Sequence, residues 1–273
     1  MTTEKIGKIV WHDLFTSNQR QAMAFYEDVA GWSYQIEHAQ DFVWGGGEKN
    51  FILALSGDEA GAGVAETPSG YENGWIAYVE VPDVDVAVKH VSALGGTTVR
   101  APFNVPGVGR NALVRDPCSA LFGLSVSQHS FPVPRRQFGP EVYVGSGHDL
   151  PHQFYTELFG WQVNPKRGEE HVTLLGPSGE PVVIEHITTG PDGSNAAWVP
   201  SVRVASVHDA LRTAENKGRL PPLWSSMTLL ILTAAFSMIQ KARGLFSGLL
   251  DVFRLLSLST GSVHGNTSAL QTR

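Results

Sequence analysis

Two short β-rich runs carry side chains that could do chemistry. Each run places three aromatic, aliphatic or carboxylate residues at alternate positions, and the six are Trp11, Asp13, Phe15, Ile76, Tyr78 and Glu80. Because successive side chains of a strand point to opposite faces, the three residues of each run share one face. Aromatic walls that hold carboxylates suit an apolar or cationic small molecule, so these six residues are the candidate ligand-binding site.

Asp13 and Glu80 are the candidate catalytic residues of this set. Burial of two neighbouring carboxylates could raise the pKa of one of them enough for general acid/base work near neutral pH. Two plainer interpretations stay open. Carboxylates at the mouth of a cleft are commonly solvated charge, and strand-borne Trp and Phe side chains are commonly core residues.

The composition is that of a folded protein, with 273 residues of which 42% are hydrophobic and 17% are charged. The formal net charge is -6 and the basic residues are scattered, so neither a nucleic-acid partner nor a membrane partner is expected. Cys118 is the only cysteine, which excludes an internal disulfide and a CxxC-type zinc site. No apolar secretory segment precedes the first strand-like run, so a cytoplasmic location is expected.

The elements that position these residues belong to an internal repeat. A Phe-Tyr pair followed by a Gly-Trp pair occurs twice with identical spacing, in residues 24–32 and 153–161. A second pattern, an apolar run with a tryptophan near its start, occurs in residues 74–81 and again in 197–204. The order A, B, A, B indicates a duplicated pair of modules, joined by a proline-rich linker.

Each module is predicted to contain a strand, a helix and three further strands. In the first, Ser17 or Asn18 caps a helix that Gly31 ends, and in the second, Gly95 and Gly96 close the helix. The predicted strands of the first module are 8–16, 32–36, 42–44 and 51–55. Those of the second module are 75–81, 97–100, 111–115 and 120–126.

Four partial motifs in this order resemble the vicinal oxygen chelate superfamily, which includes glyoxalases, bleomycin-resistance proteins and dioxygenases. The matching residues are Leu14, Thr16, Asn18, Phe25, Tyr26, Gly31, Trp32, Val81, Asp83, Asp85, Gly95, Gly96, Asp116, Pro117, Phe154, Tyr155, Gly160 and Trp161. The resemblance covers roughly Lys8 to Gly218. It implies an α+β fold in which tandem βαβββ modules form incomplete barrels, with the six candidate residues inside the first one.

The resemblance also implies a division of the chain. We expect a first glyoxalase-like domain in residues 1–129, a linker in 130–140, a second domain with an incomplete fourth module in 141–219, and an atypical tail in 220–273. An altered C-terminus, a helical replacement or a membrane anchor could each explain this apolar tail, which is expected to be helical or disordered. Because the incomplete module leaves an apolar face uncovered, self-association through the second domain is also expected.

In the metal enzymes of this superfamily, His or Glu side chains from the opening and closing strands hold a divalent cation. Alignment on the motifs places Trp11, Ile76 and Gly123 at such positions, and the expected closing strand of the first module, residues 51–56, carries no ligand. His12 has the parity of the residues that face the helix. In the second half, Glu185 precedes His186, and alternation favours a solvent-facing Glu185. We therefore expect no metal ion and no other cofactor.

Three hypotheses for function remain. The first is a metal-independent protein that binds a small molecule in its aromatic cleft. The second is a metal-free acid/base enzyme that uses Asp13 or Glu80. The third is a divalent-metal lyase or dioxygenase of the same superfamily. Whether the protein is an enzyme is left open by the sequence.

Overall fold

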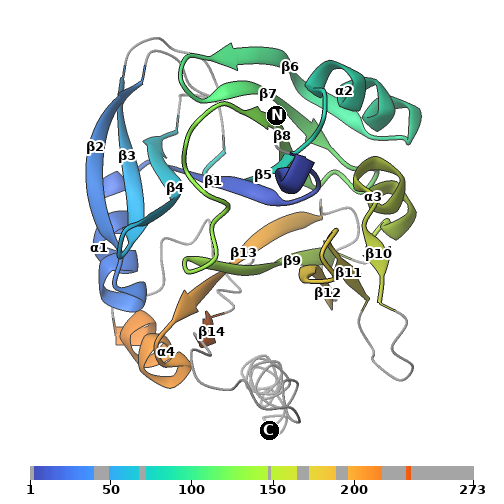
Figure 1. Ribbon diagram of the computed structural model, residues 1–273. Coiled ribbons are helices and arrows are strands. Elements are labelled where there is room, and N and C mark those ends of the chain that lie inside the picture. Colours follow the sequence, from blue (N-terminus) through green and yellow to red (C-terminus); the bar gives the residue numbers. More distant parts are fainter. Residues whose placement is uncertain are drawn as a thin grey trace, which may run out of the picture. The chain divides into compact units, whose positions relative to one another are not determined.

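The computed structural model describes residues 3–39, 49–67, 72–146, 149–164, 172–188, 196–216 and 232–234. The chain from Met1 to Ala235 forms one compact unit, drawn in Figure 1. It contains two open β-sheets with helices packed on them, which agrees with the α+β fold of tandem modules and incomplete barrels predicted above.

The first sheet has eight strands in the order β2-β3-β4-β1-β5-β8-β7-β6. Their bounds are β1 Ile9–Thr16, β2 Ser33–Ala39, β3 Lys49–Ser56, β4 Glu59–Glu66, β5 Gly74–Glu80, β6 Thr97–Val105, β7 Gly109–Arg115 and β8 Leu121–Ser127. The opening strand of each module pairs in parallel with its closing strand, β1 with β4 and β5 with β8, and the antiparallel pair β1–β5 joins the two modules.

Local sequence explains the helices of this sheet. In α1 (Gln19–Ala30) the side chain of Asn18 accepts a hydrogen bond from the backbone of Gln21, and Gly31 ends the helix in the left-handed conformation with φ 68. In α2 (Val84–Ala93) the side chain of Asp83 caps the backbone of Val86 in the same way. A short 3-10 helix, η1 (Thr3–Lys5), precedes β1.

The first module differs from the prediction in its last strand. Residues 51–55 belong to β3, which pairs with β2 and β4, and the closing strand is β4, a segment rich in glycine and alanine that was not predicted as a strand. The predicted strand 42–44 lies outside the described residues. The closing-strand position of the first module, at which a metal ligand was considered, therefore lies on β4 and not in residues 51–56.

The second sheet has six strands in the order β10-β11-β12-β9-β13-β14. Their bounds are β9 Phe138–Ser146, β10 Gln162–Val163, β11 Thr173–Leu175, β12 Pro181–Thr188, β13 Ala197–Val204 and β14 Leu232–Ala234. Its helices are α3 (His152–Phe159) and α4 (Val207–Asn216). Strands β9 and β13 form the antiparallel centre, as β1 and β5 do in the first sheet.

The helix-bearing sides of the two sheets share their cores. One core combines Val91 and Phe122 of the second module with Phe154 and Phe159 of the third. The other combines Phe25 and Val29 of the first module with Val202 and Ala210 of the fourth, and the others in this core include Trp32 and Phe138. Helix α1 contacts α4, and α2 contacts α3, as Figure 1 shows. The two halves therefore bury their apolar helix faces against each other.

Little of the predicted tail, residues 220–273, lies in the described part of the chain. Its described residues form β14, which pairs in parallel with β13 as the closing strands of the other modules pair with their opening strands. The second sheet thus extends beyond residue 219, where we had placed the end of the second domain. Among the described residues, no helix is both long and apolar enough to cross a membrane.

Candidate functional site

The concave face of the first sheet, on the side away from α1 and α2, brings the candidate residues together. Trp11 pairs with Tyr78 across the β1–β5 ladder, and Asp13 pairs with Ile76. Phe15, Ile76 and Tyr78 share one apolar cluster, on which Trp11 packs. Other residues of this cluster are Val10, Phe51, Ala65, Phe103, Leu113, Leu121 and Val133. Strand alternation therefore predicted which side chains of β1 and β5 share this face.

Asp13 is the buried carboxyl at the centre of this face, with 6% of its surface exposed. Its Oδ1 accepts a hydrogen bond of 2.9 Å from Nε1 of Trp11. Burial raises the pKa of Asp13 to about 6, while the Trp11 hydrogen bond and the nearby Tyr78 hydroxyl lower it in part. Asp13 can therefore take up and release a proton near neutral pH.

Tyr78 supplies a second polar group beside Asp13. Burial and the Asp13 carboxylate hold the pKa of Tyr78 well above its ordinary value, so the phenol stays protonated. Although the two groups affect each other electrostatically, the buried Tyr78 hydroxyl has no hydrogen-bond partner of acceptable geometry among the described residues. A buried polar atom without a partner costs free energy and is often satisfied by a ligand or a water molecule.

Glu80 lies at the far end of the same face. It is four residues beyond Ile76, the partner of Asp13, which corresponds to about 13 Å along the strand. Both carboxylate oxygens of Glu80 accept the backbone N–H of Ser127 at 3.1 Å, and burial raises the pKa of Glu80. The two candidate acids therefore do not form a pair. Burial raises the pKa of Asp13, and a neighbouring carboxylate is not the cause.

The linker that follows β8 covers part of this face. The ring of Phe131 stacks on Trp11 with a centroid distance of 5.7 Å and an interplanar angle of 28°. The ring of His129 lies 5.6 Å from Trp11 at an angle of 55°. Val133 packs against the same cluster. Side chains from outside the sheet therefore cover the part of this face around Trp11.

The strand register defines the four positions at which this fold would place metal ligands. Because Trp11 pairs with Tyr78 and Asp13 with Ile76, Trp11 and Ile76 are equivalent in the two modules. Gly123 pairs with Tyr78, and its equivalent Gly63 pairs with Asp13.

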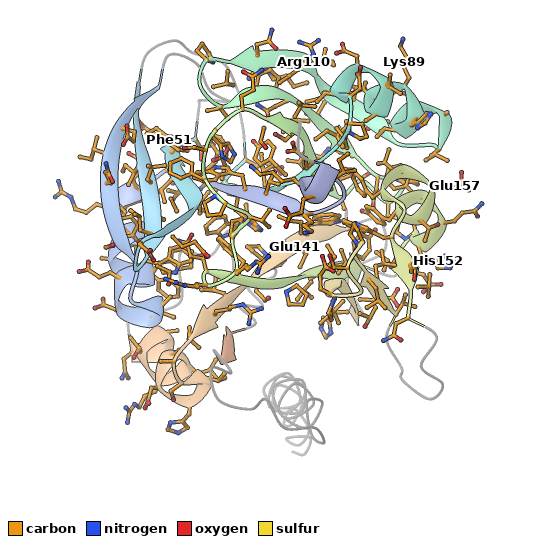
Figure 2. The ribbon with its side chains drawn as sticks, viewed as in Figure 1. Phe51, Lys89, Arg110, Glu141, His152 and Glu157 are labelled. Carbon is orange, nitrogen blue, oxygen red and sulfur yellow. The ribbon has the colours of Figure 1, made fainter. Side chains whose placement is uncertain are left out.

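Both glycines lie beneath aromatic rings. A Cβ atom at Gly63 would overlap the ring of Phe51, and one at Gly123 would meet the ring of Tyr78. Figure 2 labels Phe51 on β3. Tryptophan, isoleucine and glycine offer no coordinating side chain, so this donor set does not fit a divalent ion. Among the described residues, no group of three His, Cys, Asp or Glu side chains is arranged to hold a metal.

The remaining candidates lie on the helix-facing sides. His12 is buried between the two sheets, where its Nε2 lies 2.8 Å from Oε1 of Glu141 and its ring stacks on Phe138 at 3.9 Å. Glu141, labelled in Figure 2, comes from β9. The helix-facing direction predicted for His12 agrees with this position.

The solvent-facing direction that we predicted for Glu185 is wrong. Glu185 is 3% exposed and accepts backbone hydrogen bonds from Leu150 at 2.6 Å and Val172 at 3.1 Å. It pairs with Tyr143, a residue of the core between the halves, so it faces α3. Its carboxylate satisfies backbone donors at the ends of loops, a structural role.

Sequence reasoning missed the contribution of the linker. Proline-rich composition marked residues 130–140 as a connection, and nothing in it pointed to a contact with Trp11. The one signal was the alternation of larger and smaller side chains around His129 and Phe131, which is too short to separate a covering strand from a loop.

Comparison with known proteins places this geometry in a family. Residues 5–124 match the model of the Glyoxalase/Bleomycin resistance protein/Dioxygenase superfamily. This part of the chain belongs to that superfamily. CFP32 of Mycobacterium tuberculosis, described as a "Putative glyoxylase", is 33% identical over 119 residues, which are 43% of each chain. The anthracycline biosynthesis protein DnrV of Streptomyces peucetius is 24% identical over 133 residues, 45% of this chain and 48% of that one.

The matched regions thus span less than half the length of these relatives. Solved structures of a synthase and of a dioxygenase extend the likeness in fold over a larger share of this chain. A mutant of 4-hydroxymandelate synthase from Streptomyces coelicolor has a TM-score of 0.52 at 12% identity, over 78% of this chain and 76% of that one. A substrate complex of homoprotocatechuate 2,3-dioxygenase from Brevibacterium fuscum has a TM-score of 0.51 at 15% identity, over 83% and 70%. At these identities the likeness shows the shared fold.

Proposed function

We propose that the first domain binds a small aromatic molecule on the concave face of its sheet without a metal ion. The observation that carries this proposal is the content of the four metal-ligand positions, where Trp11, Gly63, Ile76 and Gly123 stand. Rings fill the space in which a cation would lie, while Asp13 and Tyr78 remain as polar groups among apolar walls. Such a surface favours an apolar or cationic ligand with a planar ring.

The name of one relative points to a ligand for a test. DnrV is named for anthracycline biosynthesis, and anthracyclines contain a planar fused-ring system of the kind that this face would suit. We would measure binding of an anthracycline and of simpler aromatic molecules by isothermal titration, in EDTA and after addition of Mn²⁺ or Zn²⁺. Binding in EDTA that added ions do not change is the expected result. Binding that appears only with a divalent ion would favour the metal lyase or dioxygenase hypothesis instead.

A second function, acid/base catalysis by Asp13, is favoured by one specific observation. The pKa of Asp13 is raised to about 6, so both protonation states are populated near neutral pH. If the ligand is turned over, the Asp13→Asn variant should lose turnover and keep its affinity for the ligand. Glu80 makes a matched comparison, because its carboxylate is engaged with the backbone of Ser127 and its replacement by Gln should leave turnover largely intact.

A further inference from the structure

The segment Ser127–Val133 lies against the Trp11 side of the first sheet with alternating burial of its residues. The partly buried residues are Ser127, His129, Phe131 and Val133. Of these, Phe131 stacks on Trp11, and Val133 packs against the apolar cluster. The residues between them, Gln128, Ser130 and Pro132, are exposed. Alternation with a period of two is the pattern of an extended chain with one face on the protein. The segment therefore presents every second side chain to the site.

Hydrogen bonds fix this segment on both sides of His129. At its start, Glu80 holds the backbone N–H of Ser127. In its middle, Nζ of Lys5 donates to the carbonyl of Phe131 at 3.3 Å.

After the segment, Oε1 of Glu59 accepts the backbone N–H groups of Arg135 at 3.0 Å, Arg136 at 2.6 Å and Gln137 at 3.2 Å. Glu59 is the first residue of β4, and Glu80 is the last residue of β5. The sheet itself thus holds the segment over the site.

Two polar side-chain atoms of this segment are buried without a partner. They are Nδ1 of His129 and the hydroxyl of Ser127, neither of which has a hydrogen-bond partner among the described residues. Burial, with a smaller effect of Lys5, lowers the pKa of His129 to about 4, so its imidazole is neutral at pH 7. A neutral imidazole can accept a hydrogen bond at one ring nitrogen.

We infer that His129, in the segment Ser127–Val133, is a recognition residue of this site, accepting a hydrogen bond from a hydroxyl on a planar aromatic ligand that stacks on Trp11. This inference rests on the proposed function and names the class of ligand, an aromatic alcohol. The 5.7 Å between the rings of Trp11 and Phe131 is the spacing of direct ring contact, so no further ring fits between them. The ligand ring therefore takes the place of Phe131.

The test compares 2-naphthol with naphthalene, which differ by one hydroxyl, in titrations with the full chain. His129→Phe keeps a ring against Trp11 and removes the acceptor, and it should weaken 2-naphthol binding about tenfold while leaving naphthalene binding unchanged. His129→Asn, whose side-chain oxygen can accept near the position of Nδ1, should restore most of the affinity. Phe131→Ala should strengthen the binding of both probes, because the ligand no longer has to displace that ring.

Ser130→Ala is the matched control, since its side chain belongs to the outward-facing set and should change neither affinity. Near-ultraviolet circular dichroism would show that every variant keeps its packed aromatic core. Equal binding of 2-naphthol by the wild type and by His129→Phe would overturn the role of His129 and leave the proposed binding function standing. Failure of the folded wild type to bind either probe would contradict both.

Discussion

The two halves of the repeat contain the same aromatic pair in different surroundings. In the first half the hydroxyl of Tyr26 accepts a hydrogen bond of 3.0 Å from Nε1 of Trp75, and in the second the hydroxyl of Tyr155 accepts one of 2.9 Å from Trp198. Tyr155 also donates to Oδ2 of Asp116 at 2.7 Å. The repeated sequence thus produces the Tyr–Trp hydrogen bond in both halves. The further hydrogen bond of Tyr155 comes from Asp116, which is outside the repeated pair.

The two junctions between the halves consequently differ in chemistry. On the side of α2 and α3, Asp116 accepts from the hydroxyls of Tyr143 and Tyr155 and from two backbone N–H groups of its own turn. On the side of α1 and α4, His12 faces Glu141 beneath Phe138. A buried carboxylate with four donors is well satisfied, while a His–Glu pair depends on one contact, so the first junction should be the stronger.

The largest expected effect is at the Asp116 junction. Asp116→Ala leaves two tyrosine hydroxyls and the backbone N–H groups of Cys118 and Ala120 without their acceptor, and it should lower the free energy of unfolding by about 3–5 kcal/mol. Urea denaturation would measure the loss. Asp58→Ala, at an exposed carboxylate, is the control and should cost little. Equal losses for the two variants would show that the junction does not depend on Asp116.

Replacement of Asp13 should raise the free energy of unfolding, whereas replacement of Asp116 lowers it. The reason is that the Asp13 carboxylate is buried with fewer hydrogen-bond donors than that of Asp116. The folded-state pKa of Asp13 is raised from 3.8 to about 6, so its favourable contribution is present below pH 4 and is lost as the pH rises through 6. Asp13→Asn keeps an oxygen for Trp11 and should stabilise the protein by up to about 3 kcal/mol at pH 8.

Denaturation at pH 8 and at pH 4.5 would test this, with a much smaller gain expected at the lower pH. A gain of the same size at both values would mean that the benefit has nothing to do with ionisation of Asp13. Glu59→Gln is a useful comparison, since that carboxylate accepts three backbone N–H groups of the linker and its replacement should destabilise.

The smallest expected effect is the difference in stability loss between substitutions in the two Tyr–Trp pairs. Tyr26→Phe removes the acceptor for Trp75 and should cost about 1 kcal/mol, while Tyr155→Phe removes both the acceptor for Trp198 and a donor to Asp116 and should cost about 2 kcal/mol. Thermal unfolding of both variants measures the difference. In an Asp116→Ala background the gap should shrink, and a gap that stays the same would mean that Asp116 is not its cause.

Local chemistry made much of the fold predictable from the sequence. The helix α1 begins after Asn18 and ends at Gly31 because a side-chain cap and a left-handed glycine act within a few residues. The separation of Asp13 from His12 onto opposite faces followed from strand alternation, which depends only on the pleat. The repeat of Tyr26 and Trp75 by Tyr155 and Trp198 also predicted the duplicated modules, because equal residues build equal pairs.

Only the tertiary structure decided the rest. Strand β4 carries mostly glycine and alanine, which have low strand propensity, and it is a strand because β1 and β3 pair with it on both sides. Glu185 is buried because α3 and its loop cover that side of β12, which alternation along one strand cannot reveal.

The candidate site shows the same division. Strand alternation in the sequence predicted that Trp11, Asp13 and Tyr78 share one face, whereas the position of Gly63 opposite Asp13 became visible only with the pairing of β1 and β4. The burial that raises the pKa of Asp13 arises from contacts between segments far apart in the chain, as do the contacts of His129 and Phe131 with Trp11. Such contacts depend on how the sheet curves and where the linker crosses it, and these are properties of the folded chain as a whole.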